Sequence, residues 1–184
     1  MAIIDKLTTI ANTIRSKNGT TNAMTLDEMS NAIKNIQTGM ITSDNRCTKI
    51  PDYLFCGCAN LSLMELPSGI TIIGDSAFAG CTSLALTELP SGVTSIGSGA
   101  FAGCTSLALT SLPSELTSID VNAFKNCTGL TSLTFKGTPN TIDSTAFSGC
   151  TNLTTINVPW AEDAVEKAPW GAPNATINYN YVSV

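Results

Sequence analysis

The twelve residues from Ile73 to Leu84 read Ile-Gly-Asp-Ser-Ala-Phe-Ala-Gly-Cys-Thr-Ser-Leu, and they recur almost unchanged from Ile96 to Leu107, twenty-three positions further along the chain. Four columns of residues keep this spacing over five copies. They are Ile50, Ile73, Ile96, Ile119 and Ile142; Phe55, Phe78, Phe101, Phe124 and Phe147; Cys58, Cys81, Cys104, Cys127 and Cys150; and Leu61, Leu84, Leu107, Leu130 and Leu153. A fixed period of this length predicts a solenoid of five coils, in which each coil stacks these residues on the same residues of its neighbours.

The residue before each column cysteine indicates a turn. It is glycine at positions 57, 80, 103 and 149 and asparagine at position 126. Glycine and asparagine are the residues that most readily adopt a positive φ, so this position is expected to close a short helical turn. Pro67, Pro90, Pro113 and Pro159 follow apolar residues and are expected to end short strands.

The run Ile-Gly-x-x-Ala-Phe-x-Gly-Cys-x-x-Leu, followed by Leu-Pro, resembles the BspA-type leucine-rich repeat over residues 47–159. The resemblance implies a right-handed α/β solenoid with a parallel sheet on one side, built of strands about 4.8 Å apart. It also implies a surface-exposed protein that acts in binding and adhesion and is not an enzyme. We expect a helical hairpin at residues 1–40, a solenoid at 41–159 and a C-terminal cap at 160–184.

Composition excludes several functional classes. The chain has 184 residues and a net charge of −5, with 12% charged residues, 43% hydrophobic residues and no histidine. No Lys or Arg occurs between Ile50 and Phe124, so the solenoid is expected to repel phosphate and not to bind nucleic acid. No apolar run approaches the roughly 18 residues of a membrane span. The first residues, Met1 to Asp5, are not typical of a signal peptide.

The N-terminal segment has the pattern of two amphipathic helices. Apolar residues at helical spacing predict one helix over residues 3–16, and Thr25–Glu28 is a capping box that predicts a second helix to about Gln37. The pair either covers the first coil or attaches the protein to something else. Residues 10–21 and 24–29, with the C-terminal residues 158–160, 168–172 and 174–179, resemble tail-associated proteins of phages and prophages of Gram-positive bacteria. This second resemblance implies attachment to a virion through residues 1–40.

The C-terminal segment is expected to cap the last coil. Ile177, Tyr179 and Tyr181 alternate with asparagines and predict a final strand, while residues 162–167 predict a short helix. Trp160 and Trp170 flank that helix. We expect the two indoles to cover the end of the stack; the alternative is an exposed platform on which a sugar ring stacks.

The seven cysteines suggest neither a metal site nor a cofactor. Zinc ligands normally come in close pairs, whereas the only close pair here is Cys56 and Cys58. We expect buried free thiols that act as small hydrophobic residues. Disulfides between neighbouring coils are the alternative, because Cα atoms about 5 Å apart satisfy the distance criterion.

The carboxylates form columns and not a catalytic pair. Glu65 and Glu88 share a column with Ser111, and Asp75 shares one with Ser98 and Val121. Two acids on neighbouring coils could imitate a glycosidase dyad. Without a third group or a closing loop, a solvated face is the better interpretation, and no residue is predicted to be catalytic.

A candidate binding face lies on the predicted sheet. Its predicted residues are Leu63, Glu65, Leu86, Glu88, Leu109, Ser111, Ser132 and Thr134. If the three leucines point outward, they form an exposed apolar ridge, and such patches usually mark interaction sites. The alternative is a local bulge that turns them inward and leaves Thr87 and Thr110 outside.

These patterns predict a non-enzymatic binding and structural protein. The leading hypothesis is a phage or prophage tail-associated component that presents a rigid surface to a protein or glycan of the host. A bacterial cell-surface adhesin is the alternative, and a glycan hydrolase or a structural spacer is less favoured. We expect a virion-associated or cell-surface location, no membrane insertion, and either virion attachment or self-association through residues 1–40.

Overall fold

The computed structural model describes residues 48–182 except residues 64 and 163. The helices predicted for residues 1–40 lie outside the described residues. The described part contains nine strands and no helix, so the α/β class is not confirmed and the described chain is a parallel β-solenoid. The strands are β1 (Lys49–Ile50), β2 (Ile72–Ile73), β3 (Ser95–Ile96), β4 (Ser111–Leu112), β5 (Ser118–Ile119), β6 (Ser132–Phe135), β7 (Thr141–Ile142), β8 (Thr155–Asn157) and β9 (Thr176–Asn178).

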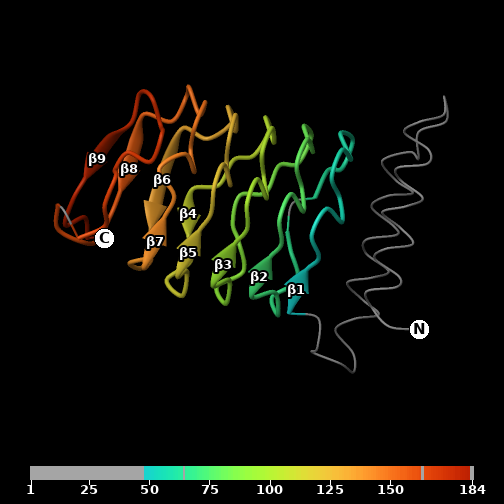
Figure 1. Cartoon of the computed structure of the whole chain (residues 1–184), viewed down its shortest axis with the longest axis horizontal. Helices are drawn as coiled ribbons and strands as arrows, with labels where there is room; N and C mark the ends of the chain where they lie inside the picture. Colours follow the sequence, from blue (N-terminus) through green and yellow to red (C-terminus); the bar gives the residue numbers. More distant parts are fainter. Residues whose placement is uncertain (1–47, 64, 163, 183–184) are drawn as a thin grey trace.

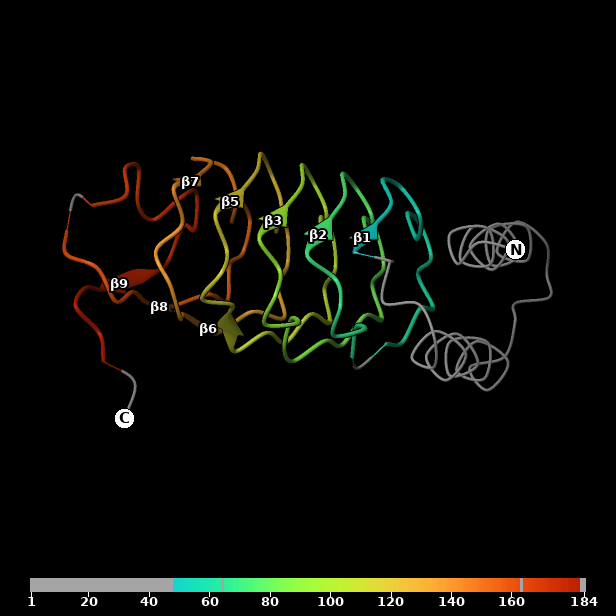
Figure 2. The ribbon, with the colours of Figure 1, turned by 90° about the horizontal axis from the view of Figure 1, so that it is seen from below.

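The strands form two parallel sheets on opposite sides of the coils, not one sheet as expected (Figures 1 and 2). We call the five-stranded sheet, in the order β1-β2-β3-β5-β7, sheet A, and the four-stranded sheet, in the order β4-β6-β8-β9, sheet B. Sheet A is built around the isoleucine column, since β2 pairs with β3 through Ile73 and Ile96. Sheet B uses a second apolar position of each coil, at which β4 and β6 pair Leu112 with Phe135.

Like side chains stack on like in the interior, as the period predicts. The rings of Phe55, Phe78, Phe101, Phe124 and Phe147 form a continuous stack. Successive centroids are 5.1–5.4 Å apart and successive planes are inclined by 12° or less. The isoleucine, cysteine and leucine columns are buried beside this stack. Each ring inside the stack therefore contacts a copy of itself above and below, and the coil length cannot change without breaking these contacts.

The turn predicted before each cysteine has the expected backbone conformation. Gly57, Gly80, Gly103 and Gly149 have φ between 73° and 76°, and Asn126 has φ 58°. An L-residue with a Cβ rarely adopts this region, and asparagine is one of the few that does. The substitution pattern at this position therefore reflects the backbone and not a ligand.

A sixth, irregular coil follows the five predicted ones. The backbone amide of Phe147 donates to the carbonyl of Trp170 over 2.9 Å, as earlier phenylalanines donate to the next coil. Trp170 and Trp160 are 0% and 6% exposed and pack with Phe135, so they close the stack and do not form an open platform. The short helix predicted for residues 162–167 is wrong for the described residues 162 and 164–167, which form turns and bends. The predicted final strand exists but ends at Asn178.

Candidate functional site

The outward-facing side chains of sheet B and its continuation into the first coils form one polar surface. We call the following set, whose members are exposed or partly exposed except Asn157, which is only 9% exposed, the polar face: Glu65, Glu88, Ser111, Ser132, Thr134, Thr155, Asn157 and Asn178. The predicted residues Glu65, Glu88 and Ser132 are exposed, and Ser111 and Thr134 are partly exposed. The structure therefore brings the polar members of the predicted binding set together on one side of the solenoid.

The predicted apolar ridge is wrong. Leu63, Leu86 and Leu109 are 7%, 0% and 2% exposed and belong to the core. Their exposed neighbours are Thr87 and Thr110, so the alternative with a local bulge is correct.

The bulge lies two residue positions earlier in the fourth coil than in the third, and between these two positions the alternation of the strand is shifted by one residue. In the third coil the two consecutive outward residues are Thr110 and Ser111, whereas in the fourth they are Thr131 and Ser132. Side chains alternate between the two faces of a strand, so a shift of one residue exchanges inside and outside. Leu109 therefore points inward although Ser132, at the same position of the next coil, points outward.

Hydrogen bonds order the polar face toward the C-terminus. The Nδ2 of Asn157 donates to Oγ1 of Thr134 over 3.1 Å, and the Nδ2 of Asn178 donates to Oδ1 of Asn157 over 2.8 Å. The strands beneath these side chains are paired in register. This end of the face is therefore a pre-arranged row of amide and hydroxyl groups, while Glu65 and Glu88 make its other end acidic.

The buried thiols are hydrogen-bond donors. Each column cysteine from Cys81 to Cys150 donates its S–H to the carbonyl of a phenylalanine in the preceding coil, over 3.0–3.1 Å. Burial raises the pKa of Cys104 to about 12 and that of Cys150 to about 11. The described cysteines are free thiols, so the disulfide alternative does not hold for them.

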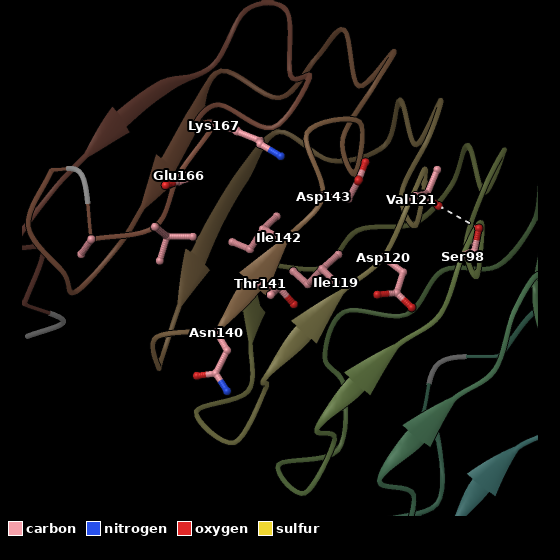
Figure 3. Close-up of a pocket in the computed structure, with 12 residues that line it drawn as sticks. Ser98, Ile119, Asp120, Val121, Asn140, Thr141, Ile142, Asp143, Glu166 and Lys167 are labelled. Atoms are coloured by element: carbon pink, nitrogen blue, oxygen red, sulfur yellow. Dashed lines mark hydrogen bonds between the residues drawn. The ribbon is translucent and has the colours of Figure 1, made fainter.

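The structure contains a cleft that the sequence analysis did not identify (Figure 3). It has a volume of about 590 Å³ and lies between the end of sheet A and residues 164–167 of the sixth coil. Asp120, Asp143 and Glu166 line it together with Lys167. A signal was present, because acids follow the isoleucine column at positions 120 and 143 where earlier copies carry Gly74 and Gly97.

The two aspartates of this cleft have opposite pKa shifts. Burial raises the pKa of Asp120, and the nearby carboxylates of Asp75 and Asp143 raise it further. The pKa of Asp143 is lowered mainly by the hydrogen bonds that its carboxylate accepts from Thr145, with a smaller contribution from Lys167. Asp120 thus lacks the compensating groups that Asp143 has.

Neither a metal centre nor a membrane span is identified within the part of the chain that the structure describes. No cluster of three or more Cys, Asp or Glu side chains there is arranged to hold a metal ion. No described segment forms a helix of the length and apolarity needed to cross a bilayer.

Comparison with known proteins agrees with the observed architecture. The model of the BspA-type leucine-rich repeat region matches residues 48–167 in six copies, one more than the five coils predicted from the phenylalanine and cysteine columns. The matched residues include Val165, which stands one period after Ile142 of the isoleucine column.

One solved structure is similar to this chain. It is a leucine-rich repeat protein from Bacteroides ovatus, with 26% identity and a TM-score of 0.41. The match covers 60% of this chain and 34% of that protein, so the chain spans about a third of its length. No curated protein matches the chain.

Proposed function

Since the chain belongs to the BspA-type leucine-rich repeat family, we propose that it is a non-enzymatic binding and structural protein that presents the polar face to a protein or glycan on a host surface. The single observation that carries this proposal is the register of the polar face. Its amide and hydroxyl groups stand on strands that pair in order from β4 to β9. A ligand that repeats along its own length would meet a hydroxyl or an amide group at each coil from β4 to β9.

The rigidity of the coils favours this function. The stacked phenylalanines and paired strands fix the polar face before any ligand arrives, so little conformational entropy is lost on binding. Several weak contacts made by one rigid surface add up to useful avidity. The absence of histidine from the sequence removes the commonest general base, which favours binding over catalysis.

We place the protein on a phage or prophage tail. The support is the resemblance of residues 10–21, 24–29, 158–160, 168–172 and 174–179 to tail-associated proteins of phages and prophages of Gram-positive bacteria. Residues 1–40 would then attach the protein to the virion, and the polar face would point toward the host. A cell-surface adhesin is the alternative, and the family resemblance alone favours it. Tail-structural genes beside the coding sequence would support the virion; an export or anchoring context would support the adhesin.

A pull-down of Gram-positive cell envelope by the full chain tests the binding function. Ser132→Lys places a long charged side chain at the exposed start of β6, in the middle of the polar face. Ile72→Lys is the matched control, because Ile72 is 38% exposed on sheet A and Lys49 occupies the equivalent position of β1.

We expect the unmodified chain and Ile72→Lys to retain envelope material, and Ser132→Lys to lose most of it. Equal retention by the two variants would contradict the polar face as the site. Turnover of a glycan substrate that disappears in Glu65→Gln or Glu88→Gln would contradict the non-enzymatic assignment.

A further inference from the structure

Within the described chain, sheet A ends at β7 with an edge that lacks a partner strand. In earlier coils, the carbonyl of each isoleucine of the column accepts a hydrogen bond from the next coil. The donor is the backbone amide of the residue that follows the isoleucine of that next coil. The distances are 2.9 Å for Ile50, 2.8 Å for Ile73, 3.0 Å for Ile96 and 2.9 Å for Ile119. Among the described residues, no backbone amide donates to the carbonyl of Asn140 or of Ile142. β7 accordingly pairs with β5 alone.

The sixth coil leaves this edge open because it departs from the strand path. Val165 occupies the isoleucine position, one period after Ile142, and is buried, but Glu166 and Lys167 follow it as turn residues. Lys167 has φ 67°, a value incompatible with a strand. The regular path resumes at Trp170, whose carbonyl accepts from Phe147. The cleft of about 590 Å³ lies where the next strand of sheet A would otherwise run (Figure 3).

The charged side chains that line the cleft at this edge are mostly negative. Asp120, Asp143 and Glu166 line the cleft against a single ammonium group, that of Lys167, among the described residues. In Figure 3 Lys167 extends toward Asp143, while Asp120 lies on the side away from it. A positively charged group entering beside Asp120 would therefore meet a carboxylate that has no cation near it among the described residues lining the cleft.

We propose that the open edge of β7 is a docking site for an extended peptide segment carrying lysine or arginine, which adds to sheet A as a further strand. Unpaired strand edges are templates for another strand, and main-chain hydrogen bonds supply affinity that does not depend on sequence. Specificity would come from basic side chains that reach Asp120 and Glu166. The raised pKa of Asp120, caused by burial and by the carboxylates of Asp75 and Asp143, agrees with a site that a cationic partner stabilises.

A short synthetic peptide tests this proposal on the full chain. The probe is a seven-residue acetylated and amidated peptide of alternating lysine and threonine, and the same peptide with glutamate for lysine is its control. Amide shifts in NMR spectra report where each one binds. We expect saturable shifts of the amides of residues 140–143 with the lysine peptide and none with the glutamate peptide.

Two N-methylated isomers of the lysine peptide separate strand addition from simple charge attraction. Methylation at the odd or at the even positions blocks one edge of the peptide each time. One isomer is expected to lose the shifts at residues 140–143, and the other to keep them. Equal binding by the two isomers would overturn the proposal.

Protein variants test the charge contribution. Asp120→Asn with Glu166→Gln is expected to weaken binding of the lysine peptide about fivefold, and Glu65→Gln, an exposed acid on the polar face, to leave it unchanged. Shifts of residues 140–143 that depend on protein concentration without peptide would mean that a second copy occupies the edge, and would overturn the assignment to a basic partner. Ser132→Lys should not affect peptide binding at β7, although it is expected to abolish retention of cell envelope by the polar face. A wrong docking site at β7 can therefore be distinguished from a wrong binding function of the polar face.

Discussion

The regular coils and the sixth coil bury their apolar side chains in different ways. From Phe55 to Phe147 each ring rests on a copy of itself, so one set of side chains serves every coil. The sixth coil has no further copy beyond it within the described chain, and there Trp160 and Trp170 pack on each other and on Phe135 of β6 in tilted and edge contacts. Repetition thus stabilises the middle of the solenoid, while its C-terminal end needs larger side chains and an irregular backbone.

The largest effect is expected from the middle of the phenylalanine stack. Phe101 is fully buried between Phe78 and Phe124. Phe101→Ala should lower the free energy of unfolding by about 3–5 kcal/mol, because it removes a large buried ring and both of its stacking partners lose contact. Denaturant unfolding measures it, with Val121→Ala, at a position 46% exposed, as the control. A loss below about 1 kcal/mol would contradict the stacked interior.

Substitutions in the sixth coil should destabilise that coil and leave the earlier coils almost unchanged. Trp170→Phe removes the hydrogen bond from Nε1 to the carbonyl of Glu166 (2.8 Å) and part of the buried ring, for an expected loss of about 2 kcal/mol. Trp160→Phe should cost less, since the Nε1 of Trp160 has no hydrogen-bond partner among the described residues. Hydrogen exchange should accelerate in residues 164–178 of Trp170→Phe and hardly at all in the second and third coils. Uniform acceleration would mean that the cap and the coils unfold as one unit.

A smaller effect is expected from the thiol hydrogen bonds. Cys104→Ala removes the donor to the carbonyl of Phe78 and should lower the free energy of unfolding by about 1 kcal/mol at neutral pH. The folded pKa of Cys104, about 12, lies above the unfolded value of 9.0, so its contribution is complete below pH 9 and is lost as the pH rises toward 12. The variant should therefore lose less stability than the unmodified chain between pH 9 and 10. Identical pH profiles would show that this thiol ionises freely in the folded protein.

The smallest effects concern the acids of the cleft, and they should have opposite signs. The folded pKa of Asp120 is raised, so its charge opposes folding at neutral pH, and this penalty is relieved as the pH falls. The folded pKa of Asp143 is lowered, so its contribution is present above the unfolded value and is lost as the pH falls below it. At pH 7, Asp120→Asn should raise and Asp143→Asn should lower the free energy of unfolding, each by about 0.5 kcal/mol or less. Changes of the same sign would contradict the different surroundings assigned to the two carboxylates.

The interior could be predicted from the sequence because its geometry repeats. A constant spacing places Phe78 on Phe101 whatever the shape of the coil, and the glycines before the cysteines indicate the turn that closes it. The sheet predicted at Ser111, Ser132 and Thr134 is sheet B. Sheet A is the unexpected one, because the isoleucine column predicts a buried position in each coil and not a second strand.

The outer surface was less predictable, for a physical reason. Whether Leu109 points inward depends on a bulge of one residue, and a column of leucines fits either orientation. The cleft beside β7 depends on where the sixth coil leaves the strand path at Lys167. Periodicity indicates where a repeat holds, and it contains no information on the path taken where the repeat ends.

Deletion of one complete coil tests most directly whether the protein is a stack of equivalent windings. Removal of residues 81–103 joins Gly80 to Cys104, the same Gly-Cys step that precedes each of these cysteines, and places Phe78 on Phe124. Removal of residues 81–92 deletes about half a coil and puts every later column out of register. The measurement is the denaturant unfolding transition of each chain. The account predicts a cooperative transition for the first deletion and none for the second; cooperative unfolding of both, or of neither, would contradict it.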